Sequence, residues 1–145
     1  MATIDGGSGS DTLLGSPDDD LLRGFGGDDF LRGVEGADTL DGGAGEDMAA
    51  YDGGLVNSGT GVVVNLSNTS QTVANVTYAP STALDRYGSI DVLISIEQAR
   101  GGGGADVFFG SSGYTFFQGR GGADTYIGGH PVLYAIEGPY GGQYN

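Results

Sequence analysis

A nine-residue period organises the first fifty residues of the chain and limits what they can fold into. From Gly6 the sequence divides into five units, at 6–14, 15–23, 24–32, 33–41 and 42–50. Each unit begins with glycine, has aspartate sixth and an apolar residue eighth. The sixth residues are Asp11, Asp20, Asp29, Asp38 and Asp47, and the eighth are Leu13, Leu22, Leu31, Leu40 and Ala49. Glycine enrichment alone would not keep this phase, so the period indicates a repeated structural unit.

The residue types of the unit predict its backbone. Six glycine-rich residues allow the positive φ angles of a tight turn. The last three residues form a short strand whose middle residue, the eighth of the unit, points inward. Such a strand is not stable alone and needs neighbours at about 4.8 Å. Two units then make one coil, and we expect an all-β fold: a right-handed parallel β-roll, a solenoid of stacked coils.

Stacking places the aspartates in rows. Asp11, Asp29 and Asp47 would lie along one edge of the roll, and Asp20 and Asp38 along the other. The chain has 19 acidic and 5 basic residues and a net charge of −14, so stacked carboxylates would repel unless a cation lay between them. Calcium, which takes six to eight oxygen ligands, meets this need. Nucleic acid and anionic membranes are disfavoured as partners by the same charge.

The composition of the chain decides which other interpretations of the sequence remain. An acidic, glycine-rich disordered linker would have a similar composition, but it would not keep the repeat phase. The chain has no cysteine, which rules out disulfides and thiolate metal sites. No apolar run is long enough for a membrane span, and residues 1–5 lack the features of a cleavable signal peptide.

The unit GGSGSDTLL at 6–14 resembles the G-G-x-G-x-D-x-U-x nonapeptide of the RTX (repeats-in-toxin) calcium-binding β-roll family. The resemblance implies a calcium ion between turns two units apart, held by two sixth-position aspartates and by turn carbonyls. The implied pairs are Asp11 with Asp29, Asp20 with Asp38, and Asp29 with Asp47. The implied carbonyl ligands are those of Gly6, Gly7, Gly9, Gly24, Gly26, Gly27, Gly33, Glu35, Gly36, Gly42, Ala44, Gly102, Gly104, Gly119 and Gly121.

Some units depart from the family pattern. Ser16, Pro17 and Asp18 replace the start of the second turn, and Phe25 and Val34 replace the second glycine of the next two. The pairs Asp11/Asp29 and Asp29/Asp47 are therefore better candidates than Asp20/Asp38.

Residues 51–100 break the phase. Two runs read as strands, 62–66 and 91–96, and residues 67–82 between them read as loop or irregular edge. They resemble the interruptions of RTX repeats, which implies that both strands join the roll as longer coils in an inserted or widened segment. A linker between two rolls is the alternative.

The phase returns in the units 101–109, 110–118 and 119–127. Asp106 and Asp124 occupy the sixth positions of the outer two and form a further candidate pair, which brings the expected number of calcium ions to about four. Thr115 replaces aspartate in the middle unit, so the opposite edge should bind no ion there. Inward residues are now Phe108, Phe117 and Tyr126. We interpret residues 1–145 as one module whose cap or tail is 128–145.

The outward residues Val107, Phe109, Thr125 and Ile127 would form an apolar stripe facing water. Such a patch is usually covered or used. The sequence hypothesis is that residues 130–145, which carry several large apolar side chains, fold back over the stripe. A contact with a partner domain or a second copy is the alternative.

The functional expectation is a secreted, non-enzymatic calcium-binding module that folds when it meets extracellular calcium. Resemblance to the RTX family implies type I secretion from a Gram-negative bacterium. His130 has no catalytic partners in the sequence. The alternative function is an accessory polysaccharide-binding module of a larger secreted enzyme, since Phe30, Arg23 and Arg32 occupy outward positions. A threonine ladder for ice or surface adhesion is interrupted by apolar residues at the seventh positions, and we set it aside.

Overall fold

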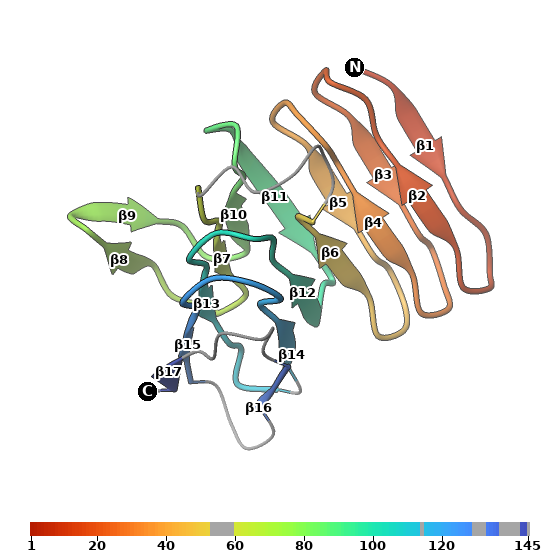
Figure 1. Ribbon diagram of the computed structural model, residues 1–145. Helices are drawn as coiled ribbons and strands as arrows, with labels where there is room; N and C mark the ends of the chain where they lie inside the picture. Colours follow the sequence, from red (N-terminus) through yellow and green to blue (C-terminus); the bar gives the residue numbers. More distant parts are fainter. Residues whose placement is uncertain (53–59, 114, 129–132, 137–142, 145) are drawn as a thin grey trace.

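The computed structural model describes residues 1–52, 60–113, 115–128, 133–136 and 143–144. Within them the chain forms two large sheets that face each other, and Figure 1 shows the successive coils side by side. The nine-stranded sheet has the order β1 (Thr3–Asp5), β3 (Leu21–Arg23), β5 (Thr39–Asp41), β11 (Ile90–Ile94), β10 (Thr82–Leu84), β7 (Val63–Asn65), β13 (Val107–Phe109), β15 (Thr125–Ile127) and β17 (Gln143–Tyr144). The six-stranded sheet has the order β16 (Leu133–Ile136), β14 (Thr115–Gln118), β12 (Gln98–Arg100), β6 (Met48–Ala50), β4 (Phe30–Arg32) and β2 (Thr12–Leu14).

The repeat units build this architecture as their sequence predicts. Each unit contributes its last three residues as a strand, and units two apart pair in parallel, for example Leu22 opposite Leu40 and Leu13 opposite Leu31. The eighth-position side chains face between the sheets, where Leu22, Leu31, Leu40 and Ala49 are fully buried. The expected all-β roll of turn–strand–turn–strand coils is confirmed.

Both strand-like runs of the interruption join the roll, as expected. β11 pairs in parallel with β5, and β7 pairs in parallel with β13. The strand between them, β10, is antiparallel to both neighbours, so the inserted segment departs locally from the parallel pairing of the repeats. The six-stranded sheet passes directly from β6 through β12 to β14. The nine-stranded sheet is therefore wider here, and the green strands in Figure 1 separate the red-orange coils from the blue ones.

Residues 67–82, expected to be loop or irregular edge, contain a β-hairpin and the first residue of β10. Its strands are β8 (Gln71–Val73) and β9 (Val76–Tyr78), which pair with each other. The turn residues Ala74 and Asn75 have φ of 47° and 67°, as in the type I′ turns of two-residue hairpins. The sequence reading missed it because the turn lacks the usual Asn-Gly or Asp-Gly signal.

This hairpin packs on the outer face of the nine-stranded sheet. Tyr78 and Val73 form a cluster with Val63 and Phe109, and Phe109 is only 4% exposed. The predicted apolar stripe is thus covered at Phe109 by an element that the sequence hypothesis did not assign to it. The hypothesis gave this role to 130–145, most of which lies outside the described residues. The two described strands there, β16 and β17, extend the sheets beside β14 and β15.

Aromatic side chains fill the core of the last coils. The rings of Phe108 and Phe117 stack with centroids 4.9 Å apart, and that of Tyr126 lies 5.4 Å from Phe108. All three are fully buried. No helix in the described part of the chain is long and apolar enough to cross a membrane.

Candidate metal centre

Two rows of carboxylates run along the two edges of the roll. In each row a sixth-position aspartate donates its backbone N–H to the carboxylate Oδ1 of the aspartate two units later. The four pairs expected from the sequence all show this contact: Asp11 to Asp29 at 2.7 Å, Asp20 to Asp38 at 2.8 Å, Asp29 to Asp47 at 2.8 Å and Asp106 to Asp124 at 3.0 Å. The fold thus brings together the residues of every predicted pair.

These carboxylates are buried, although the chain as a whole is strongly acidic. Asp20, Asp29, Asp38, Asp47, Asp106 and Asp124 are each at most 2% exposed, whereas Asp11 in the first coil is only half-buried. The second oxygens, Oδ2, of Asp29 and Asp47 are buried without a hydrogen-bond partner. A buried anionic oxygen without a partner is costly unless a cation compensates it. The environment of Asp29 and Asp47 therefore fits a bound metal ion.

The first glycine of a unit is required by the carboxylate of the same unit. A Cβ added to Gly24 would lie 2.0 Å from Asp29 Oδ2, and one on Gly33 would lie 2.0 Å from Asp38 Oδ2. Gly101 and Gly119 face Asp106 and Asp124 in the same way. Because real atoms do not approach so closely, only glycine leaves room for the carboxylate to fold back over the turn.

The left-handed backbone at the fourth position explains a second glycine of the unit. Gly27 and Gly36 have φ of 100° and 98°. A Cβ on Gly27 would lie 2.5 Å from the backbone of Gly9 in the preceding coil. The second position is left-handed as well, but Phe25 and Val34 adopt it with φ of 72° and 94°. These two departures from the repeat pattern are therefore strained.

The predicted carbonyl ligands lie in these turns. The Gly7 carbonyl accepts the Gly26 N–H at 3.2 Å, and the Gly102 carbonyl accepts the Gly121 N–H at 3.1 Å. The Ala44 carbonyl accepts from Gly27 at 2.9 Å. Each carbonyl oxygen has two lone pairs, so one hydrogen bond between turns leaves it able to coordinate a cation.

Burial sets the protonation of the rows when no metal is bound. It raises the pKa of Asp38 to about 6 and that of Asp106 to about 6. Burial also raises the pKa of Asp47. Asp20 is the exception, because hydrogen bonds from Ala2 and Ser16 lower its pKa. Asp38, Asp47 and Asp106 would therefore gain from a positive charge beside them.

Sequence analysis missed two members of the rows. Asp38 donates its N–H to Oδ1 of Asp91 at 2.9 Å, and Asp47 donates its N–H to Oε2 of Glu97 at 3.0 Å. Glu97 directly precedes β12, which has one buried residue in its middle as in the repeats. Asp91 lies within β11, two residues before the buried Leu93. Asp91 falls outside the nine-residue phase, whereas Glu97 lies nine residues before Asp106 and continues the phase of the second block with glutamate in place of aspartate.

Both rows are interrupted within the described coils. Val62 takes the place of an aspartate above Asp106, donating its N–H to Asp106 Oδ1 at 2.8 Å. Thr115 occupies the sixth position on the other edge, and its hydroxyl lies 3.1 Å from that of Ser111. Among the described residues no three or more histidine or acidic side chains gather closely enough to hold a metal. The repeated arrangement is instead two carboxylates with backbone oxygens.

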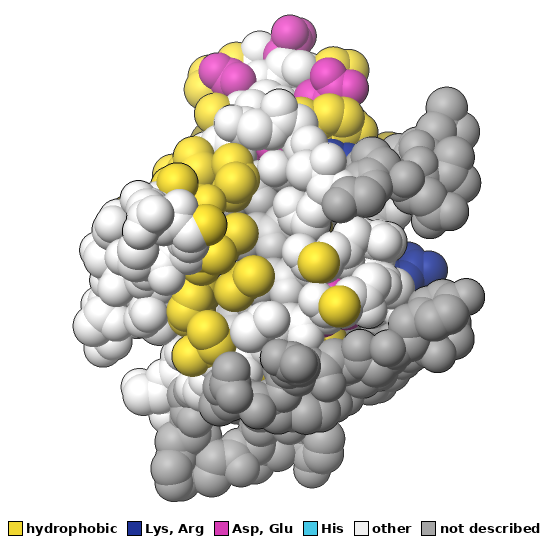
Figure 2. Space-filling model, turned by 60° about the vertical axis from the view of Figure 1, so that its left-hand side comes forward, with side chains coloured by type: hydrophobic (Ala, Val, Ile, Leu, Met, Phe, Trp, Pro, Cys, Tyr) yellow, Lys and Arg dark blue, Asp and Glu magenta, His cyan; other side chains and the backbone are white. Residues whose placement is uncertain are grey.

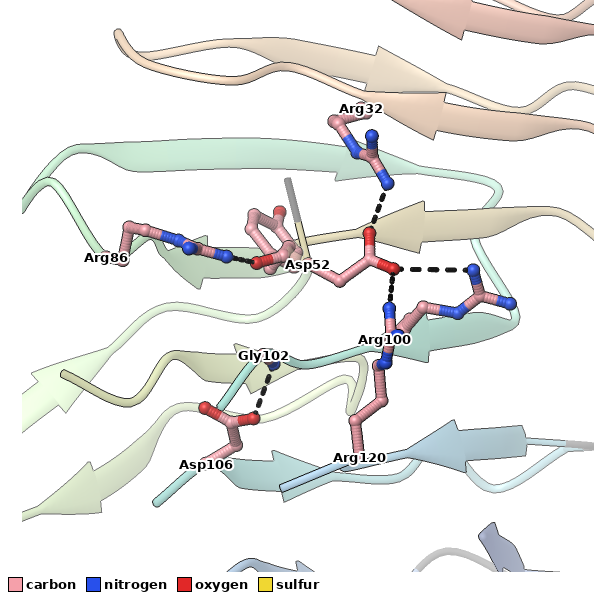
Figure 3. A network of polar contacts seen from close by, with 8 residues as sticks. Arg32, Asp52, Arg86, Arg100, Gly102, Asp106 and Arg120 are labelled. Carbon is pink, nitrogen blue, oxygen red and sulfur yellow. Dashed lines mark hydrogen bonds and ion pairs between the residues drawn. The ribbon is translucent and has the colours of Figure 1, made fainter. Parts of the chain in front are cut away.

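A separate polar network joins the ends of strands in the six-stranded sheet. Figure 3 shows Arg32, Arg100 and Arg120 directed at the carboxylate of Asp52, which is 6% exposed. Arg86 donates to the carbonyl of Tyr51 beside it. Three of the five arginines thus converge on one aspartate, which connects the first repeat block to the later coils.

Comparison with known families agrees with this geometry. A model of the RTX calcium-binding nonapeptide repeat matches the chain in four copies, at residues 5–40, 23–54 and 100–129. These ranges cover more than half of the 145 residues. No curated protein matches the chain.

Proposed function

The chain belongs to the RTX calcium-binding nonapeptide repeat family, and we propose that it is a secreted, non-catalytic module whose folding is completed by calcium after export. The observation that carries this proposal is the pair of buried, unpartnered oxygens Asp29 Oδ2 and Asp47 Oδ2 in a row of stacked carboxylates. They need a cation that accepts hard oxygen ligands, and calcium is the one that RTX repeats bind.

We assign the ions to turns two units apart. Each ion is held by two sixth-position carboxylates and by carbonyls of the two turns. The assigned carboxylate pairs are Asp11/Asp29, Asp29/Asp47, Asp20/Asp38 and Asp106/Asp124. The Asp29/Asp47 pair is the best supported, because both side chains are at most 2% exposed and both have an unpartnered oxygen.

Electrostatics explain why folding would wait for calcium. The chain has a net charge of −14, and folding buries carboxylates close to one another. Each site occupied at ten times its Kd would add about 1.4 kcal/mol to the stability of the folded state. About four such sites would match the whole stability of a small domain. Because cytosolic free calcium is far below the Kd of extracellular modules, about 10⁻⁴ to 10⁻³ M, the chain would stay unfolded until export. RTX repeats are typical of secreted proteins of Gram-negative bacteria, which supports type I secretion.

The test compares the melting temperature at rising calcium in the wild type and in Asp29→Asn. Asp29 faces two assigned ions, so the variant should lose much of the calcium-dependent rise. Asp18→Asn is the matched control, since Asp18 is an exposed carboxylate in a neighbouring turn. An equal calcium-dependent rise in melting temperature in the wild type and both variants would refute the assignment of Asp29.

Polysaccharide binding, as an accessory module of a larger secreted enzyme, is a second candidate function, for which the arginines beside Phe30 are the observation. The guanidinium carbons of Arg32 and Arg100 lie 5.4 and 5.1 Å from the centre of the Phe30 ring. Arg120, whose side chain is 52% exposed, adds a third guanidinium beside Asp52. Retention of the chain on a polysaccharide column, lost in Arg120→Gln, would support this function. Retention unchanged by that variant would count against it.

A further inference from the structure

The turn after β11 repeats the backbone geometry of the repeat turns despite its different sequence. Gly42 donates its N–H to the carbonyl of Ile94 at 2.9 Å. In the coil before, Gly24 donates its N–H to the carbonyl of Asp41 at 2.8 Å. Ile94 thus takes the place that the last residue of a repeat unit has elsewhere.

The next residue, Ser95, replaces the first glycine of a unit. A Cβ placed on Gly42 would lie 2.3 Å from the Ser95 carbonyl oxygen and 2.4 Å from Asp47 Oδ2. A Cβ placed on Gly24 would lie 2.5 Å from the Gly42 carbonyl oxygen and 2.0 Å from Asp29 Oδ2. The same two kinds of oxygen therefore approach the same point in both coils.

Glu97 takes the place of the sixth-position aspartate of a repeat unit, with a longer side chain. The turn of a unit has six residues, whereas only three, 95–97, separate β11 from β12. The additional methylene of glutamate compensates for this shorter turn, and Glu97 Oε2 accepts the Asp47 N–H at 3.0 Å. Ala99 then pairs with Ala49 in the usual register. Asp47 is fully buried, and its Oδ2 has no partner.

The row of carboxylates on the opposite edge of the roll also continues into the interruption. Asp38 and Asp91 are each 2% exposed and are joined by the Asp38 N–H, which Asp91 Oδ1 accepts. Asp85 lines one small cavity beside this turn, together with Arg32 and Arg86. Asp85 Oδ2 is buried without a hydrogen-bond partner. A buried carboxylate pair with an unpartnered carboxylate oxygen near it fits a bound cation.

We propose that Glu97 with Asp47, and Asp91 with Asp38, form two further calcium sites. The inference rests on the proposed function and extends it to residues outside the repeat units 6–50 and 101–127. Both new ligands lie between the ranges that match the family model. The ions would fasten β11 and β12 to the first repeat block, so calcium-driven folding would pass through the interruption toward the second block.

The experiment counts calcium ions bound to the full chain at saturation, by native mass spectrometry after removal of metal with a chelator. The wild type should bind about six ions, counting the four repeat pairs and the two new sites. Glu97→Gln and Asp91→Asn should each bind about one fewer. Glu46→Gln is the matched control, because Glu46 is an exposed carboxylate in the Asp47 turn and should keep the wild-type count.

Asp29→Asn separates this inference from the function on which it rests. A wild type that binds about four ions, with a loss in Asp29→Asn but none in Glu97→Gln or Asp91→Asn, would overturn the inference and leave calcium binding by the repeats intact. A wild type that binds no calcium would overturn both. The wild-type count decides between six and four even where a variant does not fold.

Discussion

Asp11 donates its backbone N–H to the carboxylate of Asp29, eighteen residues later, at 2.7 Å. The carboxylate of each coil therefore closes the turn of the coil before it. This relationship explains why the aspartate recurs at a fixed position: it positions the turn of the preceding coil and supplies the charge for which calcium is needed. Loss of one carboxylate should affect two coils.

Substitution of Gly24 by alanine tests the steric role of the first glycine. The new methyl group would lie 2.0 Å from Asp29 Oδ2 and 2.5 Å from the Gly42 carbonyl. We expect a loss of about 3 kcal/mol in the free energy of unfolding at saturating calcium, measured by denaturant titration. Gly9→Ala is the control, since a Cβ there meets nothing within 4 Å. Equal stabilities of the two variants would contradict the account.

Substitution of Val34 by glycine should stabilise the protein. Val34 has φ of 94°, a conformation that is costly for a β-branched residue. Glycine relieves this strain but loses more backbone entropy on folding than valine does. The net effect should be a free energy of unfolding higher by about 1 kcal/mol, measured as a higher melting temperature in calcium. Val76→Gly, in strand β9, should instead destabilise. A lower melting temperature for Val34→Gly would show that Val34 is not strained.

Replacement of Asp52 by asparagine should leave three arginines without their shared anion. Asp52 is 6% exposed, and it contacts Arg32, Arg100 and Arg120. Because the arginines are partly exposed, water would offset part of the loss, and we expect a destabilisation of about 1–2 kcal/mol. The exposed pair of Asp5 with Arg23 gives the comparison: Asp5→Asn should change the unfolding free energy by less than about 1 kcal/mol.

The metal-free chain should fold better in mild acid than in mild base. Burial raises the pKa of Asp38 and Asp106 to about 6 and that of Asp91 to about 7, from 3.8. A raised pKa in the folded state means that folding takes up protons, so this stability is present below pH 3.8 and is lost as the pH rises through 6 to 7. The lowered pKa of Asp20 acts in the opposite direction at a single residue.

Circular dichroism of the chain in a chelator, at pH 5 and at pH 8, tests the predicted direction of this pH dependence. The β-sheet signal should be stronger at pH 5, whereas calcium affinity should rise from pH 5 to pH 8 because calcium needs ionised carboxylates. A metal-free signal that is stronger at pH 8 would contradict the burial argument.

The repeats were the predictable part of the fold. Leu22, Leu31 and Leu40 are fully buried where the eighth position places them, and the predicted aspartate pairs meet. Both features follow from a nine-residue period that occurs five times in succession in the sequence. The strands of the interruption could be placed in the roll, but the antiparallel direction of β10 depends on pairing between distant residues, which no local pattern specifies.

The hairpin and the continuation of the rows were not predicted for a similar reason. Asn65 is fully buried and donates its side-chain amide to the carbonyls of Tyr78 and Ala79 at 3.2 and 2.9 Å, a role set by tertiary contact alone. Glu97 enters its row through a turn shorter than that of the repeats. Extending the phase of the second block back by one unit, with glutamate allowed at the sixth position, would have found it.

The central claim is that ions between stacked turns hold this fold together, and far-ultraviolet circular dichroism of the full chain tests it most directly. At neutral pH the chelator-treated chain should give the spectrum of a largely unfolded polypeptide. Millimolar calcium should convert this to a β-sheet spectrum, and millimolar magnesium should not, since its small octahedral shell suits these sites poorly. A β-sheet spectrum and melting temperature that are the same in chelator and in calcium would contradict the account.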